Sequence, residues 1–188
     1  EGGKGLLMMT KASDTPIPWI ESLAAAADRP YLVAALLHSN LTPEATFEDL
    51  DHIAAARSRG QRMVGAVSAC PLNFEFTMHE PYVFEGLAAW QPLMKMDEPD
   101  VKKALGDAAF RRRLKDELAK RSRRMFTGEW EKAFVAQVAD PAHAASEGQS
   151  IEALAKKQGV HPVDCMLDLA LAEDLDTLFT ATLLNSDE

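Results

Sequence analysis

Residues 31 to 37 read Tyr31-Leu32-Val33-Ala34-Ala35-Leu36-Leu37, and this stretch decides the fold. An uninterrupted apolar run of this length predicts a strand that is covered on both faces, as in a parallel sheet. Two runs of similar character flank it, one from Gly5 to Thr10 and one from Arg62 to Ala69. We therefore expect three neighbouring buried strands.

The segments between these three runs carry helix signals. Asp14 and Pro16 predict the start of a first helix, which should turn Trp19 inward and stop before Pro30. A second helix should begin at Thr42-Pro43-Glu44, where a capping hydroxyl, a proline and an acidic residue suit a helix start. Strand, helix and strand in succession predict βαβ units with parallel strands.

The inward faces of the two helices follow from their spacing. In the first helix, Ile20 and Leu23 should face inward together with Trp19. The second helix should stop at Gly60, and its inward face should carry Phe47, Leu50, Ile53 and Ala54.

The middle of the chain departs from this rhythm. A polar and aromatic loop is expected from Pro71 to Glu80, and a helical excursion over about residues 81 to 124. The remaining predicted elements follow in chain order: a strand at Lys132 to Val138, a helix from Ser150 to Gly159, a helix at Val163 to Glu173 opened by His161-Pro162, and a strand at Thr177 to Leu184.

The pattern predicts an α/β fold, a partial (β/α) TIM-barrel-type segment with parallel strands, in a single domain over residues 1–188. A small open α/β sheet fits the same pattern. Five expected strands are fewer than the eight of a closed barrel, and no repeat of the length typical of solenoids is present.

Composition excludes several classes of protein. A hydrophobic share of 47% is typical of a globular chain, and a net charge of -9 disfavours binding to nucleic acid. The apolar runs are too short to cross a bilayer, so no membrane partner is expected. Two cysteines, Cys70 and Cys165, do not make a disulfide framework, and Cys165 is expected in the core. Together these features favour a cytoplasmic protein.

His38 is the leading candidate for chemistry. It follows the central strand at its carboxyl end, where parallel α/β proteins place ligands, and a neutral imidazole there could bind zinc. The alternative is a histidine that hydrogen-bonds the adjoining turn. Cys70 follows the third strand in the same way, although a small half-buried residue is the simpler interpretation.

His79 lies in the polar and aromatic loop and could line the mouth of a pocket, but aromatic loop residues also serve as anchors. His52, His143 and His161 have weaker positions. The basic residues between 111 and 124 are interleaved with acids, which favours a solvated helix face with internal ion pairs. Glycine-rich phosphate loops, His-Glu-x-x-His, Gly-x-Ser-x-Gly and His-x-His are all absent from the sequence.

Several stretches, taken in order, resemble the amidohydrolase superfamily, in particular its N-acyl-D-amino-acid deacylase (D-aminoacylase) branch. The resemblance covers most of the chain after about Tyr31. The stretches are Ala54-Ala55-Ala56-Arg57-Ser58-Arg59-Gly60, Cys70-Pro71-Leu72, Pro81-Tyr82-Val83-Phe84, Trp90-Gln91-Pro92-Leu93, Ser150-Ile151-Glu152-Ala153-Leu154-Ala155, Gly159-Val160-His161-Pro162-Val163-Asp164 and Leu183-Leu184-Asn185-Ser186-Asp187-Glu188.

The resemblance implies a barrel hydrolase that holds zinc and cleaves the amide of an N-acyl amino acid. It implies His38 as a metal ligand, and Cys70, His79 and Asn185 as candidates for the substrate pocket. The family's His-x-His motif is expected before the matched region and its Ser-Asp-Gly motif after Glu188, so Asp187 is not the family's metal-binding aspartate.

Two functional hypotheses follow. The first is a segment of a zinc-dependent amidohydrolase whose parent acts on a small N-acyl amino acid, while the segment alone holds no zinc and is inactive, because one histidine is too few for a zinc site. The second is a self-standing α/β binding or interaction module without catalysis. Unpaired strand edges further predict a homodimer.

Overall fold

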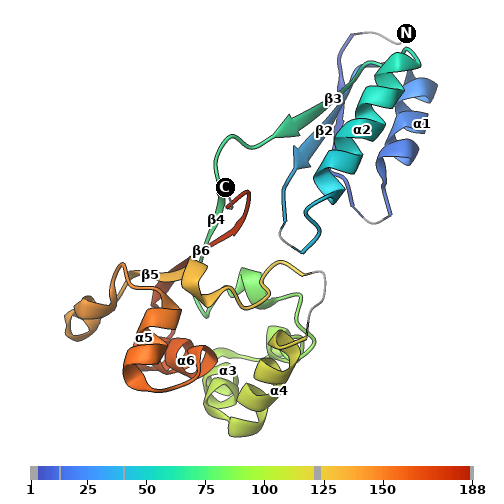
Figure 1. Ribbon diagram of the computed structural model, residues 1–188. Helices are drawn as coiled ribbons and strands as arrows, with labels where there is room; N and C mark the ends of the chain where they lie inside the picture. Colours follow the sequence, from blue (N-terminus) through green and yellow to red (C-terminus); the bar gives the residue numbers. More distant parts are fainter. Residues whose placement is uncertain (1–3, 13, 40, 121–123, 187–188) are drawn as a thin grey trace. The chain divides into compact units, whose positions relative to one another are not determined.

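The structure is a computed structural model that describes residues 4–12, 14–39, 41–120 and 124–186 (Figure 1). The chain forms two compact units, which are described separately below. Unit 1 comprises Glu1–Leu72 and Leu184–Glu188, and unit 2 comprises Asn73–Leu183. One domain over residues 1–188 stays a prediction.

Unit 1 contains the parallel sheet that the apolar runs predict. Its strands are β1 (Leu7–Met9), β2 (Tyr31–Leu36) and β3 (Met63–Val67), with β2 in the centre. Tyr31 pairs with Leu7 on one side and Met63 on the other, both in parallel. Both βαβ units are therefore confirmed, and the carboxyl ends of three strands meet at one edge of the sheet.

Helices α1 (Ile17–Ala27) and α2 (Ala45–Ser58) connect these strands and pack against the sheet (Figure 1). The core between helices and sheet is aliphatic except for Tyr31. Its fully or nearly buried members are Ile17, Ile20, Ala24, Tyr31, Val33, Leu36, Ile53, Ala56 and Met63.

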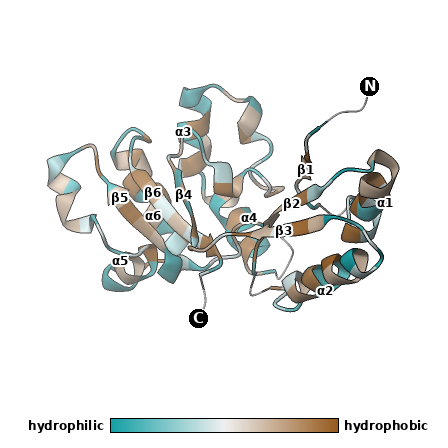
Figure 2. Ribbon diagram, turned by 90° about the horizontal axis from the view of Figure 1, so that it is seen from above, coloured by the Kyte–Doolittle hydropathy of each residue, from teal (hydrophilic) through white to brown (hydrophobic). Residues whose placement is uncertain are grey.

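The predicted inward faces were partly wrong. In α1 Ile20 is buried as expected, but Trp19 is exposed. In α2 Phe47 is 58% exposed and Leu50 is also exposed, because the buried stripe runs through Thr46, Asp49, Ile53 and Ala56 instead. Figure 2 shows the result as hydrophilic and hydrophobic segments that alternate along α2.

The polar members of this stripe have a physical reason to face inward. The Thr46 hydroxyl donates to the Leu37 carbonyl at 2.9 Å, and the Lys11 ammonium pairs with the Asp49 carboxylate at 2.5 Å. The first contact gives a donor to a backbone carbonyl beyond the end of β2, and the second pairs two charged side chains. These partners let two polar residues face inward in the first turns of α2.

The expectation that the strands are covered on both faces was also wrong for β1 and β3. Met8 is 67% exposed and Val64 is 51% exposed, while Tyr31, Val33 and Met63 are buried under the helices. Apolar side chains therefore lie on both faces of this sheet, but the helices of unit 1 cover one face.

Unit 2 holds a second three-stranded sheet in the order β4-β6-β5. Strands β5 (Ala133–Gln137) and β6 (Leu178–Leu184) appear where the sequence predicts strands, but they pair antiparallel. Strand β4 (Leu72–Phe76) lies within the segment predicted as a loop. Its alternation of exposed and buried side chains, with Phe76 inward and Glu75 outward, is a strand pattern that aromatic and polar composition concealed.

The helical excursion is shorter and more broken than predicted. The stretch from Phe84 to Met94 contains turns and the 3₁₀ helices η1 (Tyr82–Phe84) and η2 (Leu93–Lys95). The later part of the predicted excursion contains two helices, α3 (Glu98–Gly106) and α4 (Ala108–Leu118), separated at Asp107. The Asp107 carboxylate accepts from the Phe110 amide at 2.7 Å, so it caps a new helix instead of continuing the first. Residues 121–123 lie outside the described part of the chain.

The last helices match their predicted start and stop signals. In α5 (Ile151–Gln158) the Ser150 hydroxyl accepts from the Ala153 amide, and Gly159 ends the helix with a φ of 71°. In α6 (Pro162–Ala172) the ring of His161 caps the first turn. Two further 3₁₀ helices, η3 (Trp130–Lys132) and η4 (Pro141–Ser146), flank β5.

Aromatic packing forms the centre of unit 2. The Phe84 ring stacks on Trp90 at a centroid distance of 5.2 Å and meets Phe126 edge-on at 5.4 Å. Phe76 stacks on Phe179 at 5.6 Å, which joins strands β4 and β6. These offset and edge-on contacts hold the indole of Trp90 in the core of unit 2.

The basic residues of α4 are paired mainly with acids of another helix. Arg111 lies 2.7 Å from Asp168 and Lys115 lies 2.5 Å from Asp164, so both pairs join α4 to α6. No helix in the described residues has the length and hydropathy needed to cross a membrane.

Candidate functional site

The carboxyl edge of the sheet in unit 1 gathers polar side chains from separate segments. Lys11 follows β1, His38 follows β2, and Ser68 and Cys70 follow β3. The arrangement arises because parallel strands end at the same edge. This is the edge at which the sequence predicts ligands.

Asn185 joins the ends of β2 and β3. Its side-chain Oδ1 accepts from the His38 amide at 2.7 Å, and its own amide donates to the His38 carbonyl at 3.1 Å. Its Nδ2 donates to the Ser68 carbonyl at 3.5 Å. Asn185 has a φ of 52°, a left-handed conformation that asparagine tolerates better than most residues. The chain thus brings residue 185 back to residue 38 across 147 positions.

The backbone of His38 is held at both its amide and its carbonyl, but its ring is left available. The imidazole lies 6.4 Å from the ring of Phe47 in an edge-on contact. Within the described residues it makes no hydrogen bond. A neutral imidazole held in this way could accept a proton or bind a cation.

The edge does not make a metal centre from this chain's described residues. They contain no group of three or more His, Cys, Asp or Glu side chains placed to hold a metal ion. A zinc site needs at least three protein ligands, so His38 could supply one of them and no more. The residues present here do not fit zinc on their own.

Cys70 is exposed beside Ser68. Its Sγ lies 3.5 Å from the Ser68 hydroxyl, which itself donates to the Cys70 carbonyl at 2.8 Å. Among the described residues no basic side chain bonds the Cys70 thiol. The expectation that Cys70 is half-buried was wrong, because the residue is exposed. Cys165 is buried as predicted, and burial raises the pKa of its thiol to about 11.

Sequence reasoning missed the Lys11–Asp49 pair. The Asp49 carboxylate is buried on the inward face of α2, and the ammonium of Lys11 reaches it from the end of β1. The signal in the sequence was an aspartate one turn before Ile53 on the same stripe. That signal was hidden by the apolar pair Phe47 and Leu50.

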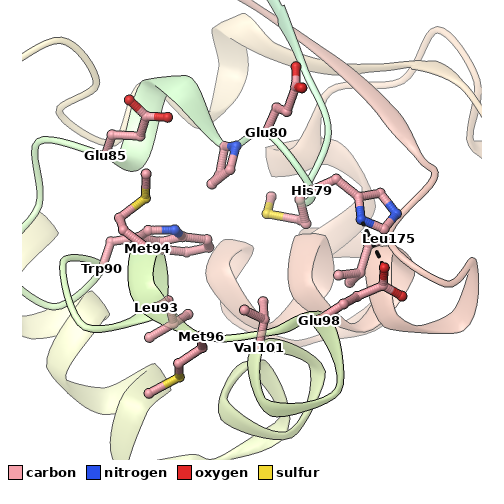
Figure 3. A pocket seen from close by; sticks show the side chains of 12 residues that line it. His79, Glu80, Glu85, Trp90, Leu93, Met94, Met96, Glu98, Val101 and Leu175 are labelled. Atoms are coloured by element: carbon pink, nitrogen blue, oxygen red, sulfur yellow. Dashed lines mark ion pairs between the residues drawn. The ribbon is translucent and has the colours of Figure 1, made fainter.

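His79 lies in unit 2 and lines a pocket of about 340 Å³ (Figure 3). The wall is largely apolar, with three methionines and one tryptophan, and three glutamates stand around it. The lining residues are Met78, His79, Glu80, Pro81, Glu85, Trp90, Leu93, Met94, Met96, Glu98, Val101 and Leu175.

The ring of His79 points toward acids on the outer side of this pocket. Its Nε2 lies 3.2 Å from Asp176 and its Nδ1 lies 3.7 Å from Glu98. Lys102 bonds Asp174 at 2.6 Å and also Glu98, which lowers the pKa of Asp174 and raises that of Lys102. His79 therefore lines this pocket, and its role in a substrate pocket stays a prediction.

The structure brings three of the predicted site residues together and places the fourth elsewhere. His38, Cys70 and Asn185 belong to unit 1 and share the carboxyl edge of its sheet. His79 belongs to unit 2. The pocket around it is lined mainly by loop residues between β4 and α3, and η2 contributes Leu93 and Met94.

No family model and no curated protein matches this sequence. Among solved structures, the chain is similar to N-acyl-D-glutamate deacylase from Bordetella bronchiseptica, determined with zinc and a phosphonate inhibitor that mimics the tetrahedral intermediate of the reaction. The identity is 9% and the TM-score is 0.38. The match covers 94% of this chain, which spans about a quarter (26%) of that structure. A likeness at this level carries no conclusion about function.

Proposed function

We propose that this chain is a segment of a metal-dependent amidohydrolase whose parent protein cleaves N-acyl-D-amino acids. The segment supplies a sheet edge with one available histidine, and by itself it does not catalyse the reaction. The supporting observation is the edge formed by His38, Ser68 and Asn185, which lies where parallel α/β enzymes bind their ligands. The ordered sequence stretches that resemble the deacylases suggest the reaction class.

The geometry at His38 suits a metal ligand or proton carrier whose backbone is held by hydrogen bonds. Two hydrogen bonds with Asn185 hold its backbone just beyond the end of β2. A bound metal would polarise the amide carbonyl and activate water. The ring of Phe47 lies beside the imidazole, with 6.4 Å between the ring centroids.

The test uses the complete reading frame in which these residues lie, together with the 188-residue chain alone. Both are loaded with zinc and assayed for amino acid release from a panel of N-acetyl-D-amino acids, N-acetyl-D-glutamate included. We expect hydrolysis by the parent protein only. His38→Ala should lower its kcat/KM by about 100-fold and reduce bound zinc, since a lost ligand or its support costs that much.

His52→Ala is the matched control, because His52 is an exposed histidine on α2 outside the edge. Its activity and zinc content should remain those of the unaltered protein. A parent protein that hydrolyses none of the panel, or a His38→Ala protein with full activity, would overturn the proposal. Hydrolysis by the 188-residue chain alone would overturn its description as an incomplete segment.

The second candidate is a binding module without catalysis. It is favoured by the pocket in unit 2, which is lined without any contribution from the His38 edge. Ligand binding by the 188-residue chain with no hydrolysis by the parent would support this candidate over the first.

A further inference from the structure

The pocket beside His79 combines a charged rim with an apolar interior. No lysine or arginine is among its lining residues, whereas Glu80, Glu85 and Glu98 all are. In Figure 3 Glu80 and Glu85 lie above the cavity in the view, with Leu93 and Val101 below it. The three carboxylates make the electrostatic potential inside the pocket negative, and the low-dielectric apolar walls strengthen this potential.

Two of the three glutamates have no basic partner. Glu98 is paired with Lys102 and approached by His79, which offsets its charge. Within the described residues, neither Glu80 nor Glu85 forms an ion pair or a side-chain hydrogen bond. Glu85 is also half-buried, and its side chain has no polar partner among the described residues. A cation in the pocket would supply one.

Trp90 supplies a second, independent indication of a ligand. The residue is only 1% exposed, yet its indole N–H donates no hydrogen bond within the described residues. The Nε of Arg124 is the one fully buried polar side-chain atom without a partner among those residues. The Trp90 nitrogen therefore keeps an opening, and the cavity that Trp90 lines provides it. Figure 3 shows the indole at the wall of the cavity beneath Met94.

The lining side chains favour a particular kind of ligand. The three methionine thioethers adapt to alkyl groups, and the glutamates favour a positive charge. The indole N–H adds a donor for one oxygen. At about 340 Å³ the pocket is at the lower end of the range for small-molecule sites, which is roughly 300 to 1,000 Å³.

We propose that this pocket binds a small organic ammonium ion that carries an oxygen acceptor, such as an alkylated amino alcohol. The cationic nitrogen lies within the field of Glu80 and Glu85, and the oxygen accepts from the indole N–H of Trp90. The alkyl groups contact Met94, Leu93 and Val101. This site is independent of the hydrolase proposal, because it uses no residue of the His38 edge.

The test is an NMR titration of the ¹⁵N-labelled 188-residue chain with choline. Binding is observed at the indole N–H cross-peaks of the three tryptophans. Trp90→Phe assigns the Trp90 peak and keeps an aromatic ring in the core. We expect choline to shift the Trp90 peak and leave those of Trp19 and Trp130 in place. The neutral isostere 3,3-dimethylbutan-1-ol should bind at least about tenfold more weakly, since it lacks only the charge.

Two variants separate the two contacts. Glu85→Gln should weaken choline binding about tenfold or more, whereas Glu75→Gln, an exposed glutamate outside the lining, should not change it. Trp90→Phe lacks the indole peak, so its binding is measured by calorimetry; it should weaken choline about three- to tenfold, the range of one hydrogen bond, and leave tetramethylammonium nearly unchanged. The proposal would be overturned by equal binding of choline and its neutral isostere, or by shifts at Trp19 or Trp130 instead of Trp90. It would also be overturned if choline bound with a dissociation constant above about 10 mM, which is weaker than that of specific small-ligand sites.

Discussion

Glu173 is a carboxylate with no exposed side-chain surface, at the end of α6. It accepts from the amides of Ala139 and Asp140, from the Thr177 hydroxyl at 2.7 Å, and lies 3.0 Å from Nδ1 of His143. Burial by itself raises the pKa of this carboxyl, but the hydrogen bonds outweigh burial and leave the pKa below its ordinary value. The ionised form is therefore part of the folded state.

We predict that Glu173→Gln destabilises the protein by about 1 to 3 kcal/mol at pH 7, because four donors lose their charged acceptor. A lowered folded-state pKa means that this stabilisation is present above the ordinary pKa of 4.5 and is lost as pH falls through the lower folded value. Thermal unfolding of both proteins from pH 7 to pH 3 should show the difference narrowing with acid. A constant difference over that range would contradict the linkage.

His161 provides an opposite case, in which the neutral form is required. Its Nδ1 accepts from the Val163 amide at 3.1 Å and caps α6, which only an unprotonated nitrogen can do. Burial first, and then the nearby charge of Lys115, lower the pKa of His161. Protonation of the unfolded chain near pH 6.5 therefore begins before protonation of the folded protein.

We predict that the cap of α6 loses stability as pH falls below about 6.5, the ordinary histidine value, toward the lower folded pKa. Hydrogen exchange at the Val163 amide should accelerate over that range. His161→Asn keeps a capping acceptor without a titration, so its exchange should show no such step. His161→Ala should cost about 0.5 to 2 kcal/mol at pH 7 and less as pH falls, because acid already weakens the cap that it removes. Identical pH profiles for the unaltered protein and His161→Asn would contradict the prediction.

At the scale of elements, the contact between β3 and α2 depends on a missing side chain. A Cβ at Gly65 would lie 2.7 Å from Cδ1 of Leu36 and 3.1 Å from Cδ1 of Ile53, both of which are buried. Both side chains would have to shift within the core to admit the added carbon. Gly65 therefore sets how closely α2 approaches the sheet and how well Leu36 packs beside the His38 edge.

We predict that Gly65→Ala destabilises unit 1 by about 1 to 3 kcal/mol through overpacking. Gly106→Ala is the matched control, since a Cβ there meets nothing within 4 Å and the residue ends helix α3. It should be neutral or stabilising by up to about 1 kcal/mol. Urea unfolding followed by circular dichroism measures both, and equal effects of the two substitutions would refute the packing argument.

At the scale of the whole molecule, the sheet of unit 1 presents apolar side chains on the face opposite its helices. Met8 in β1 and Val64 and Val67 in β3 are exposed. Both β1 and β3 are edge strands of this sheet. Exposed edges and apolar faces recruit other chains. A second copy of this chain is one such partner.

We predict a homodimer in light-scattering measurements at roughly 100 μM, the concentration at which weak complexes of this kind form. Val64→Lys adds a charge to the exposed face without touching the buried core, so it should shift the population to monomer. Leu50→Lys is the control, since Leu50 is an exposed residue of α2. A monomer at high concentration would contradict the predicted association.

The sequence by itself determined the parallel sheet of unit 1 and the caps of α5 and α6 in unit 2. These features are local: an apolar run such as Tyr31–Leu37, a serine before a helix, or a glycine at a left-handed position states its conformation within a few residues. The position of His38 at a strand end follows from the same local signals.

Only the tertiary structure decided which face of α2 turns inward, that β4 is a strand, and that Asn185 holds His38. Thr46 and Asp49 displaced Phe47 and Leu50 from the inner face because partners distant in the sequence, such as Lys11, satisfy them there. The clasp spans 147 positions and the unpaired N–H of Trp90 depends on the shape of its surroundings. Hydrogen-bond pairing and cavity shape are properties of the folded chain, and no local pattern encodes them.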